Sequence, residues 1–291
     1  MPTGTSGADA VSSFSSMGPA GQSIADEDFR FIQRLVEERT GIVLGDCKRH
    51  MVTGRLARRL RQLGLDGFGK YCAILRDDGK DEIRELINAI TTNLTAFFRE
   101  PHHFDFLAQT LIPALVSTAG RSDIRIWSAG CSTGEEAYSL AISAREALTD
   151  IARLPVKILA TDIDSNVLER AVSGVYESDR VANIAQERRK RWFLRGKGRQ
   201  EGRVQIVPGL RDLVTFRQLN LLGDWPMRRR FDAIFCRNVV IYFDKNTQRR
   251  LFDRFAEALT DNGHLFIGHS ESLFNVSDRF QLIGRTVYRK R

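Results

Sequence analysis

The residues with the clearest chemical meaning lie in the segment 123–136, which reads DIRIWSAGCSTGEE. An apolar run, glycines at 130 and 134, and a helical pattern from Glu135 predict a strand, a tight turn and a helix. The turn has neither the Lys-Ser/Thr of a P-loop nor the G-x-G-x-x-G of dinucleotide enzymes. Two carboxylates, Glu135 and Glu136, would repel a pyrophosphate where the turn enters the helix. This arrangement favours a cationic ligand such as S-adenosylmethionine, although glycines that serve only the turn geometry are the alternative.

A second acidic position supports a ligand site. The apolar run 156–161 predicts a strand that ends at Asp162, and an acid roughly 20–30 residues after such a turn can accept hydrogen bonds from a ribose. Asp164 and Ser165 are expected to cap the helix that follows, which leaves Asp162 free for the ligand.

The histidines and cysteines predict no metal site. No carboxylate or cysteine is expected at metal-ligand spacing around His102 and His103, so these residues and His269 are expected to be structural or solvated. The cysteines form no C-x-x-C pair, which is typical of free thiols in a reducing cytoplasm.

Composition limits the possible settings. The 291 residues are 42% hydrophobic, as in proteins with a substantial core, and no apolar run approaches the roughly 18 residues of a membrane span. Residues 1–23 lack the basic and apolar regions of a signal peptide and predict a disordered tail. The net charge of +8 favours an acidic partner: a nucleic acid, an anionic membrane or an acidic protein surface.

Helical patterns alone fill residues 24–90, whereas strands and helices alternate from residue 124 onward. The expected strands are 124–129, 156–161, 213–219, 231–236, 264–268 and an extended segment near 280–289; the expected helices are 134–148, 165–173 and 246–260. Alternation of this kind predicts a Rossmann-like, mostly parallel sheet covered on both faces. Ligands bind such sheets at the carboxyl ends of the strands, where Gly130, Asp162, Asn220 and Arg237 fall.

One segment interrupts the alternation. Two short strand patterns flank a glycine-rich loop at 196–202 and predict a small antiparallel β-subdomain inserted at about 188–212. It is either a surface elaboration or a sheet edge for an extended peptide, with strand 204–207 as the expected docking strand.

Over residues 27–289 the chain resembles the chemotaxis receptor glutamate methyltransferases, the CheR family. The resemblance is carried by TNLTAFFRE at 92–100, AGCSTGEE at 129–136, ATDID at 160–164, FDAIFCRNVVIYF at 231–243 and GHSES at 268–272. It implies an N-terminal helical domain at 24–90 and a class I methyltransferase domain at 91–291 that carries the β-subdomain. It also implies methyl transfer from S-adenosylmethionine to glutamates of chemoreceptors, with S-adenosylhomocysteine as the product.

The resemblance assigns individual residues. The expected cofactor-binding residues are Asn93, Thr95, Arg99, Gly130, Glu136 (with Glu135 as its alternative), Asp162, Asn220, Leu221, Arg237 and Asn238. Arg99 and Tyr242 are the expected catalytic residues, with Arg99 orienting the acceptor carboxylate and Tyr242 facing the methyl group. Without the family motif, Arg99 would be interpreted as a partner of Glu100 and Tyr242 as a core aromatic residue. A glutamate is ionised at neutral pH, so the reaction requires no strong base.

Basic residues beside the apolar stripe of segment 48–63 predict a docking face for acidic receptor helices. The alternative is a nucleic-acid methyltransferase, but the chain lacks the Asn/Asp-Pro-Pro-Tyr type of motif and carries RNVVIY there. An adaptor that binds the cofactor only as a ligand is disfavoured by the presence of Arg99 and Tyr242. We expect a cytoplasmic monomer that is recruited to membrane receptor arrays without membrane insertion, and that holds a receptor C-terminal peptide on its β-subdomain.

Overall fold

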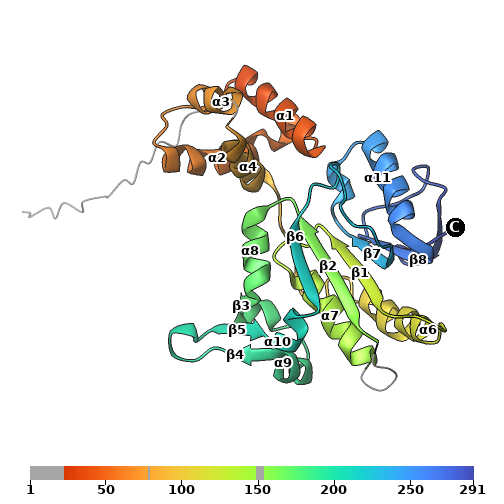
Figure 1. Ribbon diagram of the computed structural model, residues 1–291. Helices are drawn as coiled ribbons and strands as arrows, with labels where there is room; N and C mark the ends of the chain where they lie inside the picture. The colour runs from red at the N-terminus through yellow and green to blue at the C-terminus, as the bar shows by residue number, and fades with distance from the viewer. Residues whose placement is uncertain (1–22, 78, 149–153) are drawn as a thin grey trace, which may run out of the picture.

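The computed structural model describes residues 23–77, 79–148 and 154–291. The expected disordered tail, residues 1–23, therefore lies almost wholly outside the described part. Within the described residues, a group of helices sits above one end of a large sheet (Figure 1). Helix α8 has one end toward this group of helices, and a small second sheet lies at its other end.

The N-terminal part is helical, as predicted. Its elements are α1 (Asp26–Thr40), η1 (Asp46–Lys48), α2 (Arg49–Leu63), α3 (Phe68–Arg76) and α4 (Lys80–Ile90). Helices α1 and α2 each end at a glycine in the left-handed conformation, Gly41 and Gly64, which only glycine adopts without strain. The apolar faces share one core that includes Phe29, Leu56 and Leu86. Helix α3 fits the predicted helical pattern, because its buried residues recur at helical spacing.

The second part contains a seven-stranded sheet with the order β6-β2-β1-β7-β8-β10-β9. Its strands are β1 (Ile124–Ala129), β2 (Val156–Asp162), β6 (Val214–Gln218), β7 (Phe231–Cys236), β8 (Leu259–Ile267), β9 (Phe280–Gly284) and β10 (Val287–Lys290). The first five are parallel, and the extended C-terminal segment forms an antiparallel hairpin. The predicted Rossmann-like sheet is confirmed.

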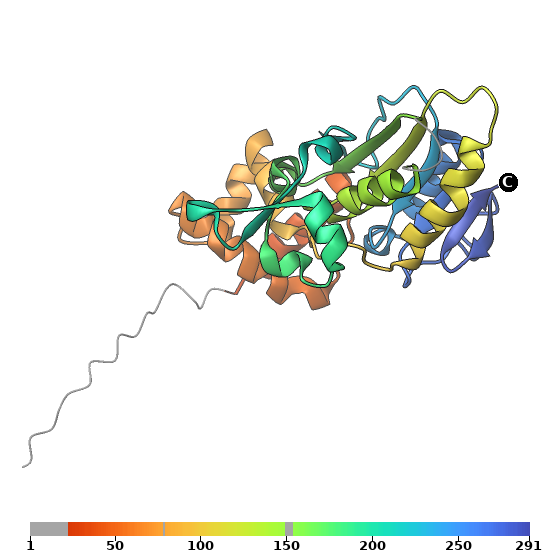
Figure 2. The same ribbon diagram turned by 90° about the horizontal axis from the view of Figure 1, so that it is seen from below.

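Helices cover both faces of this sheet (Figures 1 and 2). They are α5 (His102–Phe106), η2 (Leu107–Leu111), α6 (Ile112–Val116), α7 (Glu135–Leu148), α8 (Ser165–Ser173) and α11 (Lys245–Ala258). Alternate residues of β1 enter different cores: Ile126 packs with α7 and Leu107, whereas Trp127 packs with Phe252 and Phe255 of α11. Strand β1 is therefore covered on both sides, which explains why it has apolar residues on both of its faces.

The inserted subdomain differs from the predicted hairpin. It has three strands in the order β3-β5-β4, where β3 is Val175–Glu177, β4 is Phe193–Arg195 and β5 is Arg203–Ile206. Strand β5 is central and pairs with both neighbours. The prediction that strand 204–207 offers a free edge is wrong, because β3, from outside the expected segment, occupies that edge. Short helical segments η3 (Ser178–Val181), α9 (Gln186–Trp192), η4 (Gly198–Gln200) and α10 (Pro208–Arg211) complete the insertion.

The two parts touch, as the short connection between them predicts. Asn220 donates from Nδ2 to the Arg39 carbonyl at 2.6 Å, and the Val43 amide donates to the Tyr242 carbonyl at 2.9 Å. Gly41 is also packed closely, because a Cβ there would lie 2.2 Å from Leu222 Cδ1. None of the helices described in the structure combines the length and apolar character that crossing a membrane requires.

Candidate active site

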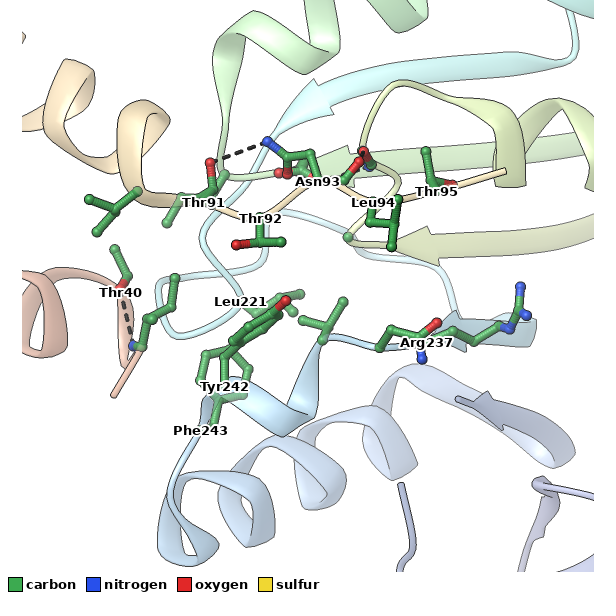
Figure 3. Close-up of a pocket in the computed structure, with 18 of the residues that line it drawn as sticks. Thr40, Thr91, Thr92, Asn93, Leu94, Thr95, Leu221, Arg237, Tyr242 and Phe243 are labelled. Atoms are coloured by element: carbon green, nitrogen blue, oxygen red, sulfur yellow. Dashed lines mark hydrogen bonds between the residues drawn. The ribbon is translucent and has the colours of Figure 1, made fainter. Parts of the chain in front are cut away.

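A pocket opens where the carboxyl ends of the parallel strands meet the N-terminal helices (Figure 3). Figure 3 shows the connecting segment Thr91–Thr95 along one side of the pocket and Leu221, Tyr242 and Phe243 along the other. The residues predicted from the sequence all line this one pocket: Asn93, Thr95, Arg99, Gly130, Glu136, Asp162, Asn220, Leu221, Arg237, Asn238 and Tyr242. The fold thus gathers residues that are up to about half the chain apart in sequence.

The glycine turn is required by its geometry. Gly130 has a φ of 90°, a conformation that side chains strongly disfavour, and an added Cβ would lie 2.4 Å from Val239 Cγ2. Its amide donates to the Thr161 carbonyl at 2.8 Å, which joins the turn after β1 to the end of β2. The glycine therefore allows the backbone of β1 to end directly at the pocket.

Asp162 points its carboxylate into the same region. It accepts hydrogen bonds from the amides of Ser132, at 2.8 Å, and of Asp164, at 3.0 Å. Burial nevertheless raises the pKa of Asp162 to about 6, and the nearby Asp164 charge acts in the same direction. A ligand that donates hydrogen bonds to this carboxylate would stabilise its ionised form.

Asp164 has the structural role that the sequence predicted. Its carboxylate caps α8 by accepting from the amides of Asn166 and Val167. The other oxygen accepts from Thr91 Oγ1 at 2.8 Å and from Asn93 Nδ2 at 2.7 Å. The connecting segment is thereby fixed to the turn after β2, and Asn93 is held in position through its amide nitrogen.

The structure distinguishes the two glutamates that begin α7. Glu135 is 1% exposed and pairs with Arg180, so it faces the inserted subdomain and does not line the pocket. Glu136 lines the pocket, accepting from Ser128 Oγ at 2.7 Å and from Arg237 at 2.9 Å. Burial raises the pKa of Glu136, although Arg237 opposes this shift. These positions favour Glu136 over its alternative as the pocket carboxylate.

Arg237 is the centre of a buried ionic network. Its side chain is 3% exposed and lies 2.9 Å from Glu136 and 3.5 Å from Glu100. It also donates to the backbone carbonyl of Arg99. The guanidinium therefore joins the strand end of β7, the start of α7 and the motif segment 92–100.

The two predicted catalytic residues stand on different elements. Arg99 belongs to the connecting segment and donates to the Leu94 carbonyl at 3.0 Å. Tyr242 ends the short helix η5 (Val240–Tyr242), and the Lys48 ammonium lies 5.2 Å from the centre of its ring. Both side chains are partly exposed and line the pocket. Tyr242 is therefore not a core residue, and Arg99 bonds to the Leu94 carbonyl and not to Glu100.

The expectation that no carboxylate lies at metal-ligand spacing around His102 and His103 was wrong. Glu100 does lie beside His102 and His103, with ligand atoms of the three residues within 4.8 Å of one another. The buried His103 uses Nε2 toward the Arg285 carbonyl and Thr286 Oγ1, and Glu100 already pairs with Arg237. Glu100 could not be assigned to this cluster from spacing, because its approach to the two histidines depends on the turn of the chain at Pro101.

The pocket also contains residues that the sequence analysis missed. The N-terminal part contributes Thr40, Ile42, Leu44, Lys48 and Met51, and the turn after β1 contributes Ser132. No local pattern assigned these residues to a pocket: Lys48 was interpreted as part of the basic segment 48–63, and the other four resemble ordinary core residues. Their contribution means that the pocket is complete only when both parts of the chain are docked.

The carboxylates and apolar walls of the pocket suit a ligand that carries positively charged groups and hydroxyls. Two carboxylates, Asp162 and Glu136, face a pocket whose other walls include Ile90, Leu219 and Leu221. Acids in apolar surroundings attract ammonium and sulfonium groups and accept hydrogen bonds from hydroxyls, but they repel phosphates. The residues present therefore fit S-adenosylmethionine, as the glycine turn predicted.

Comparison with known proteins agrees with this geometry. Residues 93–289 match the family model "CheR methyltransferase, SAM binding domain", and residues 27–91 match "CheR methyltransferase, all-alpha domain". The chain is 46% identical over 268 residues to a chemotaxis protein methyltransferase of Salmonella typhimurium, covering 91% of each chain. It is 47% identical over 264 residues to chemotaxis protein methyltransferase 2 of Pseudomonas aeruginosa, covering 90% of this chain and 92% of the relative.

Proposed function

The chain belongs to the CheR family of S-adenosylmethionine-dependent methyltransferases, and from this premise we propose that it methylates glutamate side chains on the cytoplasmic helices of chemoreceptors. The observation that carries the proposal is the single pocket that joins Asp162 and Glu136 to Arg99 and Tyr242. One side of this pocket suits the cofactor and the other can receive a carboxylate. Residues 24–90 and 91–291 act as the two domains that enclose it.

The roles of the pocket residues follow from their chemistry. Asp162 holds ribose hydroxyls, Glu136 holds the ammonium of the methionine moiety, and Asn220 and Leu221 contact the adenine. Bound S-adenosylmethionine supplies a methyl group on a sulfonium. Arg99 orients the incoming carboxylate with a fixed fork of donors, and Tyr242 faces the methyl group.

The chain needs little acid or base chemistry for this reaction. The acceptor carboxylate is already ionised near pH 7, and the departing thioether requires no proton. The enzyme must instead strip water from the carboxylate and align it without binding it so tightly that the barrier rises. We propose on these grounds that turnover needs no metal, so that it should persist in a chelator.

The activity is tested with methyl-labelled cofactor and cytoplasmic receptor fragments. Label should appear on protein, should be released as methanol by mild base, and should be lost when the acceptor glutamates are replaced by alanine. Base-stable label on the receptor, or label on RNA or DNA instead, would contradict carboxylate methylation.

Cofactor affinity is expected to depend on pH through Asp162. Because the pKa of the free residue is about 6 and hydrogen bonds from a ribose would lower it, the ligand binds the carboxylate form. Affinity should be nearly full above about pH 7, about half of that at pH 6 and about tenfold weaker at pH 5. Calorimetry with S-adenosylhomocysteine measures this change.

Asp162→Asn provides the matched variant. It should weaken binding at pH 7.5 by about 1–3 kcal/mol and lose most of the pH dependence, since an amide accepts fewer hydrogen bonds and does not titrate. Any pH dependence of affinity that remains in this variant would come from Glu136, because burial raises the pKa of that residue as well. An unchanged pH profile in the variant would remove Asp162 from the binding site.

We propose that α2 binds the receptor through fewer of its basic residues than the sequence predicted. Arg59 forms a bidentate pair with Glu82, which is 8% exposed, and Arg55 donates to the carbonyls of Ile90 and Thr91. Arg49 pairs with Asp26. These three side chains hold the helical domain together, so reversing the charge of Arg59 would test folding and not docking.

The exposed residues Arg58 and Arg61 remain available for an acidic receptor helix. The double variant Arg58→Glu/Arg61→Glu should raise KM for the receptor about tenfold at low salt with little change in kcat, and added salt should weaken the wild type similarly. Arg228→Glu/Arg279→Glu, which changes exposed arginines in the loops before β7 and β9, is the control of equal charge. Equal effects of both double variants would contradict a specific face.

We also propose that the inserted subdomain tethers a receptor C-terminal peptide, now at its β4 edge. The Gly196 amide and the Trp192 carbonyl bond to β5, which leaves the backbone groups of Phe193 and Arg195 directed outward in the antiparallel pattern. Tethering raises the local concentration of acceptor sites without changing the pocket. Peptides from receptor C-termini should bind the wild type, and Arg195→Pro should abolish binding without changing cofactor affinity; equal binding to both proteins would exclude this edge.

The remaining proposals concern the setting. We propose a cytoplasmic monomer that reaches membrane receptor arrays through its receptor contacts. Sedimentation of the purified protein and its retention on receptor-containing membranes test these two points separately.

A further inference from the structure

The motif at 268–272, GHSES, contains a buried carboxylate that does not line the pocket. Glu271 is 6% exposed and lies in the turn after β8. Burying a carboxylate without a positive partner is unfavourable unless hydrogen bonds satisfy it. A residue of this kind needs an explanation beyond turn geometry.

Backbone amides supply those hydrogen bonds. One oxygen of Glu271 accepts from the Gly268 amide at 2.6 Å and from the Asn238 amide at 2.9 Å. The other accepts from the Ile241 amide at 3.4 Å. Two of the three donors lie in the segment after β7, about 30 residues earlier in the chain, so the carboxylate fixes a loop to which it is not adjacent in sequence.

That loop carries much of the active site. Arg237, Asn238 and Tyr242 all line the pocket. Asn238 has a φ of 58°, a left-handed conformation that is unfavourable for most residues and is maintained here by the bond at its amide. The short helix that ends at Tyr242 begins two residues later.

The close approach of Gly268 to Asn238 also restrains the loop, from the same side as Glu271. A Cβ on Gly268 would lie 2.4 Å from Asn238 Nδ2 and 2.9 Å from its backbone nitrogen. Glycine at 268 thus lets the turn after β8 approach the loop closely enough for Glu271 to bind it.

We propose that Glu271 is a positioning residue that sets the backbone of loop 237–242 and, through it, the placement of Tyr242 and Asn238 in the pocket. The inference rests on the proposed function for the roles of those two residues. Glu271 acts through the backbone and touches neither cofactor nor acceptor.

The test uses Glu271→Gln, which keeps the size of the side chain. One acceptor oxygen becomes an NH2 group, which cannot accept a hydrogen bond from the backbone amides that face it. We expect kcat to fall about tenfold with KM for the receptor fragment within about twofold, because catalysis is sensitive to small displacements of aligned groups. Hydrogen exchange of the amides in 237–243 should accelerate at least about tenfold relative to the wild type. Gly268→Ala, which pushes on Asn238 from the other contact, should give the same pattern.

Two matched variants separate positioning from general destabilisation. Asp232 is 2% exposed, accepts from the Arg125 amide at 2.9 Å and from Arg121 at 2.8 Å, and lies at the opposite end of β7. Asp232→Asn should lower the melting temperature comparably while leaving kcat and exchange of the loop unchanged. Gly209→Ala, where an added Cβ meets no atom within 4 Å, is the control for Gly268→Ala.

The outcomes are distinct. If Glu271→Gln and Asp232→Asn lose equal stability and both retain wild-type kcat and loop exchange, Glu271 is only a structural residue and the inference is overturned. If the wild type methylates no receptor glutamate, the proposed function fails, and the exchange rates of the loop alone then decide whether Glu271 fixes it.

Discussion

Replacing Arg237 with alanine is expected to lower the free energy of unfolding by about 3–5 kcal/mol. The side chain is 3% exposed and neutralises both Glu136 and Glu100, whose side chains are each 11% exposed. Its removal leaves two largely buried carboxylates without their common cation, and the lost Arg99 carbonyl bond frees the motif segment as well. Urea denaturation at pH 7.5 measures the change.

The pH dependence of this variant identifies the cause. Without Arg237, the pKa of Glu136, which burial already raises, should rise further, and the pKa of Glu100, which is lowered in the wild type, should rise as well. The loss of stability is therefore largest above these pKa values and shrinks as pH falls through them. The control Lys70→Ala breaks the exposed pair with Asp66 and should change stability little at any pH. A loss below about 1 kcal/mol in the Arg237 variant would show that water compensates the carboxylates.

Replacing Arg99 with alanine is expected to lower kcat about a hundredfold while changing the affinity for S-adenosylhomocysteine less than about threefold. The reason is its proposed place where the acceptor meets the cofactor: aligning the carboxylate is expected to matter more for turnover than the contact of Arg99 with the cofactor matters for affinity. Tyr242→Phe, which removes only a hydroxyl, should lower kcat about tenfold. Single-turnover kinetics at saturating cofactor and receptor measure both.

Arg99→Lys is the informative control. Lysine keeps the positive charge but lacks the planar fork, so it should recover only part of the lost rate if orientation matters. Full recovery would indicate that charge alone attracts the acceptor. Wild-type turnover in Arg99→Ala at saturating substrates would remove this residue from the catalytic step.

Much of the site could be predicted because parallel sheets place strand ends together. Once the strands that end near Gly130, Asp162, Asn220 and Arg237 are identified from their apolar runs, any right-handed α/β arrangement brings these ends to one edge. Asp164 was also assigned correctly, since helix caps depend on residues within one turn. The motifs of the family resemblance added Asn93, Arg99 and Tyr242, and the choice of Glu136 over Glu135 needed the structure.

The sequence by itself determined the features that arise from local pattern: helix ends at glycines, buried strands, the glycine turn and the order of the two parts. Only the tertiary structure decided which distant groups meet. In the folded chain β3 pairs with β5, and Glu271 accepts a hydrogen bond from the Asn238 amide. Arg59 forms an ion pair with Glu82, and Arg237 forms one with Glu100. The physical reason is that hydrogen bonds and ion pairs act over a few ångströms with no dependence on sequence separation, so a pattern read along the chain cannot identify partners that only packing brings together.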